Sequence, residues 1–244
     1  EDLGNETIFQ ILKKKNINSF SIIRKIIRTL KKMQNIKDKK IKNFKKKNIS
    51  IQKYKKLILF NETKIFCDWY SPRKLPKKMH KIFNLSFKKE IMYLLSKLNH
   101  KNETFVHRDF HVSNLIYKDN NIGLIDNQDA LIGNRAYDLA SLVDDVRLRT
   151  SDNFKSKVYN YFLRLNKDID SKKFKNDFEI LSVLRNLKII GIFYRLAYRD
   201  KKKKYLKLIP YAWEMIFLRM SHNNYFYNLE KLIRKNFPYE SKKL

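Results

Sequence analysis

The sequence predicts an α+β protein in which helices surround one small unit of short strands. Only 4 of the 244 residues are Gly and 4 are Pro, which leaves little material for a loop-rich β-sandwich. Apolar residues recur at helical spacing over most of the chain, whereas short apolar runs typical of strands are confined to residues 104–125. The hydrophobic fraction of 43% is normal for a globular protein, and we therefore expect a buried core.

The first part of the chain contains two predicted core helices. One begins near Ser19 and carries an apolar stripe from Ile22 to Met33. The other is capped by Ser86 and carries a stripe from Phe87 to Leu98. Residues 36–56 between them are rich in Lys and show little periodicity, which predicts a loop or a marginal helix.

The predicted strands precede a second group of helices. The apolar runs are Thr104–Val106, Leu115–Tyr117 and Ile122–Ile125, and turn-forming residues separate the last two runs. This pattern predicts a β-hairpin. The helices expected after it are Tyr137–Arg149, Phe154–Leu165, Phe174–Tyr198, Tyr205–Met220 and Tyr225–Lys235.

The net charge of +31 would ordinarily suggest nucleic acid or an anionic membrane as a partner. The Lys residues are nevertheless scattered along the whole chain together with abundant Asn and Ile, which indicates a compositional drift and not one binding patch. We therefore expect a monomer that binds a small molecule rather than nucleic acid.

The remaining composition points to a cytoplasmic protein. No run approaches the ~18 apolar residues that cross a bilayer. The single Cys67 provides neither an internal disulfide nor a metal cluster. The chain begins at Glu1 without the pattern of a signal peptide, and we interpret this start as a cut end.

One predicted loop carries a concentration of unusual polar residues. Residues 105–116 read Phe-Val-His-Arg-Asp-Phe-His-Val-Ser-Asn-Leu-Ile, which places Asp109 and Asn114 five residues apart between two strands. Asp126 directly follows the next apolar strand, which we expect to be buried. Phosphoryl transfer from ATP needs a carboxylate that orients the attacking hydroxyl and accepts its proton, plus oxygen ligands for Mg²⁺. These three side chains are candidates for those roles.

The motifs resemble those of a known enzyme family. His107-Arg108-Asp109 with Asn114, then Ile125-Asp126, then Asp138-Leu139-Ala140, is similar to the signature of aminoglycoside phosphotransferase and choline kinase relatives. The closer resemblance is to the bacterial anomeric kinases of N-acetylmuramate and N-acetylglucosamine. The segments that carry it are Phe66–Tyr70, Arg108–His111, Gln128–Ala130 and Leu187–Asp200.

This resemblance implies a protein-kinase-like fold of the aminoglycoside phosphotransferase type. Residues 1–244 would form its mostly helical C-terminal lobe, with a hinge at residues 1–4, catalytic and metal-binding loops at residues 105–130, and no N-terminal β-lobe. The cofactors implied are ATP and Mg²⁺. The implied acceptor is the anomeric hydroxyl of an amino sugar, as in the recycling of cell-wall sugars.

The resemblance also assigns individual residues. Asp109 would be the catalytic base, and Asn114 and Asp126 would be the Mg²⁺ ligands. Backbone groups of Glu1 to Leu3 would contact adenine.

Further residues are assigned structural or acceptor-binding roles. His107 and Arg108 would be structural, and Asp138 would brace the catalytic loop from the start of a helix, where the helix dipole favours a carboxylate. Gln128 stands where choline kinase relatives often carry Glu. The candidate contacts to the acceptor are Asp68, Trp69, Tyr70, Gln128, Asp129 and Arg195. For Asp129 the alternative is a loop cap, and for the aromatic pair it is core packing.

Three functions remain open at this point. They are an amino-sugar kinase, a kinase for another small molecule such as choline, homoserine or an aminoglycoside, and a basic nucleic-acid or membrane-binding protein of kinase ancestry. The complete set of Asp109, Asn114 and Asp126 favours an enzyme. An intact kinase of this kind also needs a glycine-rich loop over the phosphates and a strand Lys paired with a helix Glu. The sequence has no glycine cluster, and we expect the 244-residue chain alone to be inactive.

Overall fold

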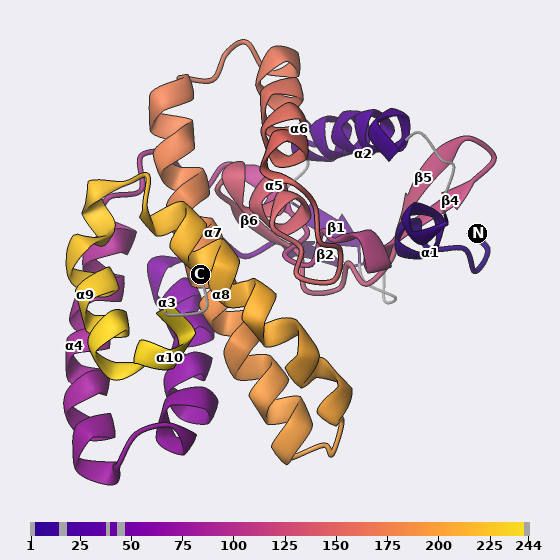
Figure 1. The fold of residues 1–244 in the computed structure, drawn as a ribbon. Helices are drawn as coiled ribbons and strands as arrows, with labels where there is room; N and C mark the ends of the chain where they lie inside the picture. Colours follow the sequence, from indigo (N-terminus) through magenta and orange to yellow (C-terminus); the bar gives the residue numbers. More distant parts are fainter. Residues whose placement is uncertain (1–2, 15–18, 38–39, 43–46, 242–244) are drawn as a thin grey trace. The chain divides into compact units, whose positions relative to one another are not determined.

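The computed structural model describes residues 3–14, 19–37, 40–42 and 47–241, which belong to two compact units (Figure 1). Unit 1 comprises residues 1–54 and 100–174, and unit 2 comprises residues 55–99 and 175–244. Each unit is therefore assembled from two separate stretches of chain.

Unit 1 combines helices with short antiparallel strand pairs. Its elements in chain order are α1 (Ile8–Lys13), α2 (Ser19–Gln34), β1 (Lys40–Lys42), β2 (Asn48–Ser50), β3 (Thr104–Val106), a 3-10 turn (Val112–Asn114), β4 (Leu115–Lys118), β5 (Asn121–Leu124), β6 (Leu131–Gly133), α5 (Ala136–Val143), α6 (Asp152–Leu165) and the first residues of α7 (Ser171–Tyr198). Among the described residues, β1 pairs with β2, β3 with β6 and β4 with β5.

The predicted β-hairpin is confirmed. β4 and β5 pair antiparallel along their whole length, and the pair farthest from the turn is Leu115 with Leu124. The turn residues Asp119 and Asn120 have φ of 48° and 66°. Two successive left-handed residues are typical of a type I′ turn, which matches the twist of the strands and which Asp and Asn tolerate.

The predicted core helix near Ser19 is also confirmed. Ile26, Ile27 and Leu30 of α2 are completely buried, and α2 packs against α6, whose direction it crosses in Figure 1. Full burial of each such side chain contributes about 1.5–3 kcal/mol relative to exposure. This stripe therefore anchors the helix in the core of unit 1.

Two predicted elements in unit 1 differ from the structure. Residues 36–56 contain β1 and β2 in place of a loop or a marginal helix. The side chains of β2 are all exposed, so that no apolar alternation marks the strand in the sequence. The helix predicted at residues 137–149 ends at Val143 because Asp145 accepts the backbone N–H of Arg147, a local bond that competes with helical pairing.

All regular elements in the described residues of unit 2 are helical. Its elements are α3 (Lys56–Ile65), a π-helical turn (Phe66–Tyr70), a 3-10 turn (Ser71–Arg73), α4 (Lys77–Ser96), most of α7, a 3-10 segment (Lys203–Leu208), α8 (Ile209–Met220), a 3-10 turn (Asn224–Phe226), α9 (Tyr227–Asn236) and α10 (Pro238–Ser241). α4 and α9 run side by side (Figure 1).

Two helices of unit 2, α4 and α8, begin next to a proline and not at the predicted residue. α4 begins at Lys77, directly after Pro76, so that Ser86 lies inside the helix and is not its cap. α8 begins at Ile209 with Pro210 in its first turn, whereas Tyr205 belongs to a 3-10 segment. Pro210 is favoured in the first turn of α8 because its fixed φ suits a helix and its missing N–H is not needed there. Pro76 stands at the N-cap of α4, outside the first turn.

Gly191 allows α7 to approach the backbone of α3 closely. A Cβ atom at Gly191 would lie 2.5 Å from the carbonyl carbon and oxygen of Ile65 and 2.6 Å from the nitrogen of Phe66. Real Cβ atoms do not approach backbone this closely. The glycine is therefore required where α3 passes into the π-helical turn.

Candidate active site

The backbone turns sharply after β3, where residues 107–114, the predicted catalytic loop, begin. Arg108 has φ of 74°, a left-handed conformation that costs a residue with a bulky side chain about 1–3 kcal/mol. The completely buried carboxylate of Asp138 accepts the N–H groups of His107, at 2.7 Å, and of Arg108, at 3.0 Å. One side chain in the first turn of α5 therefore holds the turn that immediately precedes Asp109.

The side chain of Arg108 connects the two predicted loops of the site. Its Nη1 atom donates a hydrogen bond to the carbonyl of Asp129 at 2.9 Å and lies 4.0 Å from the carboxylate of the same residue. The guanidinium lies 5.5 Å from the centre of the Tyr54 ring. These contacts join the loop after β5 to the residue before Asp109.

Asn114 closes the catalytic loop on itself. Its Nδ2 atom donates to the backbone carbonyl of Asp109 at 3.1 Å, and its own carbonyl accepts the N–H of Ile125 at 3.2 Å. The same residue therefore fixes the position of Asp109 and stands at the open end of the hairpin beside Ile125. With Nδ2 engaged, the Oδ1 atom of the amide remains as an acceptor.

Asp126 lies two residues after the end of β5, and this strand is not buried as expected. No residue of β5 is fully buried, and Ile125 is 40% exposed. The apolar run in the sequence suggested burial, but most of this strand remains partly accessible to solvent. Asp126 itself is exposed and left-handed, with φ of 65°, and its Oδ1 atom accepts a hydrogen bond from Nε2 of Gln128.

His107 is buried between the two loops. Its Nε2 atom donates to the carbonyl of Ile125 at 3.0 Å. Burial lowers the pKa of His107, while that hydrogen bond and the carboxylates of Asp109 and Asp126 act in the opposite direction. The hydrogen bond from His107 to Ile125 therefore joins the residue two positions before Asp109 to the residue directly before Asp126.

The sequence analysis missed Asp145. This buried carboxylate accepts the N–H of Val112 at 3.3 Å and the N–H and Nη1 groups of Arg147 at 3.0 and 3.2 Å. It therefore holds the catalytic loop at a second point, beyond Asp109. The available signal was a carboxylate inside the apolar helix predicted at Tyr137–Arg149, because buried acids are rare unless they are paired or hydrogen-bonded.

The proposed acceptor contacts are divided between the two units. Gln128 and Asp129 are exposed on the loop after Asp126 in unit 1. The other four candidates belong to unit 2, namely Asp68, Trp69, Tyr70 and Arg195.

Three of the candidates in unit 2 have structural contacts. Tyr70 is buried in the core and donates to Oε1 of Glu240 at 2.8 Å, as the core-packing alternative predicts. Asp68 pairs with Lys64, and the guanidinium of Arg73 lies 5.2 Å from the Trp69 ring. Arg195 is half-buried on α7.

The hinge expected at residues 1–4 is described only in part. Glu1 lies outside the described residues, and Leu3 and Gly4 are not in a strand. Pairing with the hairpin begins at Glu6, whose carbonyl accepts the N–H of Tyr117 at 3.2 Å. The Leu3 side chain packs over Gly123 of β5. The adenine contact at Glu1 to Leu3 stays a prediction.

The oxygen donors at the end of the hairpin suit Mg²⁺. No group of three or more His, Cys, Asp or Glu side chains that could hold a metal occurs within residues 3–14, 19–37, 40–42 and 47–241. Mg²⁺ in nucleotide sites needs fewer protein ligands, because one or two carboxylates act together with water and phosphate oxygens. The carboxylate of Asp126 and the amide oxygen of Asn114 provide oxygen donors of the kind that Mg²⁺ prefers, and their role as its ligands stays a prediction.

Comparisons with known proteins agree on one family. Residues 14–171 match the profile of the family described as "Phosphotransferase enzyme family". An N-acetylmuramate/N-acetylglucosamine kinase of Neisseria meningitidis is 32% identical over 168 residues, which cover 66% of this chain and 50% of that protein. A kinase of the same name from Pseudomonas putida is 25% identical over 215 residues, covering 86% and 60% of the two chains. The chain thus spans about half the length of the curated relatives it matches.

A solved structure has a similar fold. The ADP-bound crystal structure of the aminoglycoside phosphotransferase APH(2'')-Ib superposes with a TM-score of 0.52 over 87% of this chain and 70% of that chain, at 19% sequence identity. The predicted fold of the aminoglycoside phosphotransferase type is thereby confirmed. None of the helices in the described part of the chain is both long enough and apolar enough to span a membrane.

Proposed function

Because this chain belongs to the phosphotransferase enzyme family, we propose that it carries the catalytic loop and metal ligands of an ATP-dependent amino-sugar kinase. The acceptor that we propose is the anomeric hydroxyl of N-acetylmuramate or N-acetylglucosamine. The observation that carries this proposal is the bonding of the loop around Asp109, whose carbonyl accepts the Asn114 amide and whose preceding turn is held by Asp138.

In the proposed reaction the acceptor oxygen forms a bond to the γ-phosphorus of ATP, and the bond from that phosphorus to the ADP oxygen breaks. Asp109 orients the acceptor hydroxyl and accepts its proton. Asp138 and Asn114 position Asp109 through the backbone on either side of it. Such positioning is effective because phosphoryl transfer depends mainly on orientation and charge stabilisation.

Asp126 and Asn114 would hold Mg²⁺. When bound, this ion neutralises negative charge on the phosphate oxygens. His107 helps to position Asp126. Its Nε2–H group donates to the carbonyl of Ile125, the residue directly before Asp126, and so fixes the start of that loop. A buried neutral imidazole suits this role, since it donates one hydrogen bond and adds no positive charge beside the two carboxylates.

The acceptor assignment is supported by two features. The relatives aligned over half or more of this chain carry the name N-acetylmuramate/N-acetylglucosamine kinase. Gln128 and Asp129 are exposed within three residues of Asp126, where polar side chains can meet the hydroxyl groups of a sugar.

An acceptor screen on the complete gene product tests the proposal. ATP consumption should be faster with N-acetylmuramate or N-acetylglucosamine than with choline or kanamycin, and phosphorus NMR should place the new phosphate on the anomeric oxygen. Faster turnover of choline, homoserine or an aminoglycoside would assign the enzyme to another acceptor class. Absence of turnover with every acceptor would favour the binding-protein alternative.

We expect the 244-residue polypeptide alone to be inactive. Its only glycines are Gly4, Gly123, Gly133 and Gly191, so that it contains no glycine-rich loop to supply backbone N–H groups to the phosphates. Turnover by this polypeptide at the rate of the complete gene product would show that such a loop is dispensable.

A further inference from the structure

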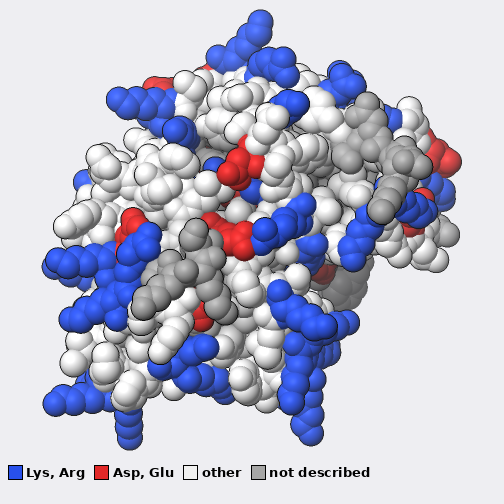
Figure 2. Space-filling view, in the orientation of Figure 1, with Lys and Arg blue, Asp and Glu red and all other residues white. Residues whose placement is uncertain are grey.

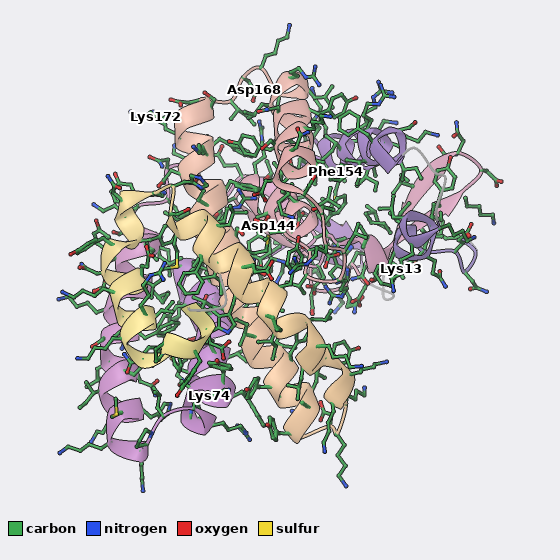
Figure 3. All side chains as sticks on the ribbon, viewed as in Figure 1. Lys13, Lys74, Asp144, Phe154, Asp168 and Lys172 are labelled. Carbon is green, nitrogen blue, oxygen red and sulfur yellow. The ribbon has the colours of Figure 1, made fainter. Side chains whose placement is uncertain are left out.

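A cleft of about 580 Å³ opens beside α2 and α6 in unit 1. It is lined by Phe20, Phe154, Lys157, Asn160 and Arg164. None of these residues belongs to the loops at residues 105–130. Figure 3 labels Phe154 close to α2. The cleft is therefore a feature for which the proposed kinase chemistry gives no reason.

Aromatic rings form the floor of this cleft. The rings of Phe20 and Phe154 meet edge to face with centroids 6.4 Å apart, and Phe20 meets Tyr161 in the same way at 6.1 Å. Phe20 and Phe154 are only half-buried, whereas Tyr161 is buried behind them. Partly exposed ring faces provide a surface on which a planar ring can stack.

Cationic side chains accompany the aromatic rings, and two of them, Lys157 and Arg164, line the cleft. The guanidinium of Arg24 lies 5.8 Å from the centre of the Phe20 ring, and that of Arg164 lies 5.6 Å from the centre of the Tyr161 ring. Arg28 donates to the Tyr161 hydroxyl at 3.0 Å, and Lys157 lines the cleft directly. All four cations are exposed.

Acidic side chains do little to offset these cations. No Asp or Glu is among the described residues that line the cleft. Asp152 is exposed in the first turn of α6, and Asp168, beyond the end of α6, is already paired with Arg135 at 2.8 Å. The charge of the cleft therefore complements an anion.

The general charge of the protein does not locate this site. Lys and Arg are spread over the face shown in Figure 2, with Asp and Glu interspersed among them. What distinguishes the cleft is the combination of cations with stacking surfaces in one concave place. This combination binds phosphates and unstacked bases together, which is how single-stranded nucleic acids are held.

We propose that the cleft between α2 and α6 binds single-stranded nucleic acid, with bases stacked on Phe20 and Phe154 and phosphates beside Lys157 and Arg164. A duplex keeps its bases stacked inside the helix and cannot use the aromatic floor. An anionic membrane would need protruding apolar groups, whereas these rings lie inside a cleft. The proposal does not depend on the acceptor or the activity of the kinase site.

Fluorescence anisotropy with a labelled oligouridylate tests the contribution of the cations to binding. A length of roughly eight nucleotides is suitable because single-strand sites span about 4–16 nucleotides. The 244-residue protein and its variants are titrated between about 50 and 200 mM salt. Lys157→Gln with Arg164→Gln should reduce the slope of log K against log salt by about 1.4, because each lost phosphate contact removes about 0.7. Lys88→Gln with Lys89→Gln is the matched control, since it removes the same charge from exposed positions on α4.

Stacking of bases on the aromatic rings is tested by changing first the protein and then the oligonucleotide. Phe20→Leu and Phe154→Leu keep an apolar side chain but lose the ring face, and each should weaken oligouridylate binding at least about fivefold. An abasic strand of equal length and charge should bind the unmodified protein weakly and should not respond to either substitution. Circular dichroism melts of both variants verify that they are folded, and either folded variant suffices.

Several outcomes would overturn the proposal. One is absence of binding at the lowest salt, and another is equal weakening of oligouridylate binding by the cleft variant and the α4 control. The proposal also fails if the unmodified protein binds the abasic strand, a duplex or free uridine monophosphate as tightly as it binds oligouridylate. Binding of phosphatidylserine vesicles that competes with the oligonucleotide and is lost in the cleft variant would assign the cleft to a membrane instead.

Discussion

The carboxylate of Asp138 and the backbone of Arg108 are joined by a 3.0 Å hydrogen bond, and Arg108 is left-handed at that point. The same carboxylate accepts the N–H of His107 at 2.7 Å. An amide at this position has only one acceptor oxygen, and its NH₂ group opposes the second backbone donor. We therefore expect Asp138→Asn to lower the free energy of unfolding by about 2–3 kcal/mol, since bonds to charged acceptors are strong and the site is buried.

Urea denaturation of the 244-residue protein measures this loss. Asp168→Asn is the matched control because Asp168 is an exposed carboxylate paired with Arg135, and its loss should cost less than about 1 kcal/mol. Equal effects of the two substitutions would show that Asp138 does not hold the turn.

Stability should depend on pH through His107. Burial lowers the pKa of His107 below its ordinary value of about 6.5. As pH falls through 6.5, the unfolded chain therefore takes up a proton that the folded protein does not bind. The stabilising contribution is complete above pH 6.5 and is lost as pH falls toward the lowered pKa of the folded state.

The comparison of two variants isolates this contribution. His107→Gln retains a side-chain N–H that can reach the carbonyl of Ile125, so its free energy of unfolding should fall less between pH 7.5 and 5.5 than that of the unmodified protein. His222→Gln, at an exposed position, should keep the dependence of the unmodified protein. Identical pH dependence in all three proteins would exclude a buried neutral His107.

Gly191→Ala should destabilise unit 2 by about 2–3 kcal/mol, because the new Cβ meets the backbone of Ile65 and Phe66 and neither helix can yield. Gly123→Ala is the matched control. Its Cβ would approach Leu3 at 2.8 Å, but the contact is with the end of a flexible side chain, which can rotate away. Thermal and urea unfolding should therefore separate the two glycines, and similar stability of both variants would disprove the close approach of α7 to α3.

Asp126→Asn should weaken the binding of ADP in the presence of Mg²⁺ by at least about tenfold and leave binding in EDTA unchanged. Asn is chosen because it tolerates the left-handed backbone at this position. Isothermal calorimetry on the complete gene product measures both affinities without requiring turnover. Asp129→Asn, a nearby exposed carboxylate, serves as the control, and equal losses in the two variants would remove Asp126 from the metal site.

The sequence was informative where side-chain pattern and local chemistry coincide. The stripe of α2 and the turn at Asp119 and Asn120 predicted a core helix and a hairpin, and both are present. The apolar runs also placed Asp109 and Asn114 between β3 and β4. These features depend on neighbouring residues and can be inferred from spacing.

Features that depend on distant backbone could not be inferred in this way. β2 is exposed on every residue, so that no periodicity marks it. The bond from Val112 to Asp145 joins residues 33 positions apart, and the need for Gly191 arises from the backbone at Ile65. Only the tertiary structure supplies such partners.

Steady-state turnover of Asp109→Asn in the complete gene product tests the proposed kinase function most directly. Removal of a general base lowers the rate by about 10²–10⁴, because the acceptor hydroxyl is no longer oriented or deprotonated. The affinity for Mg²⁺ and ADP should change little, since Asn114 and Asp126 are retained. A turnover number close to that of the unmodified enzyme would contradict the assignment of Asp109 as the catalytic carboxylate.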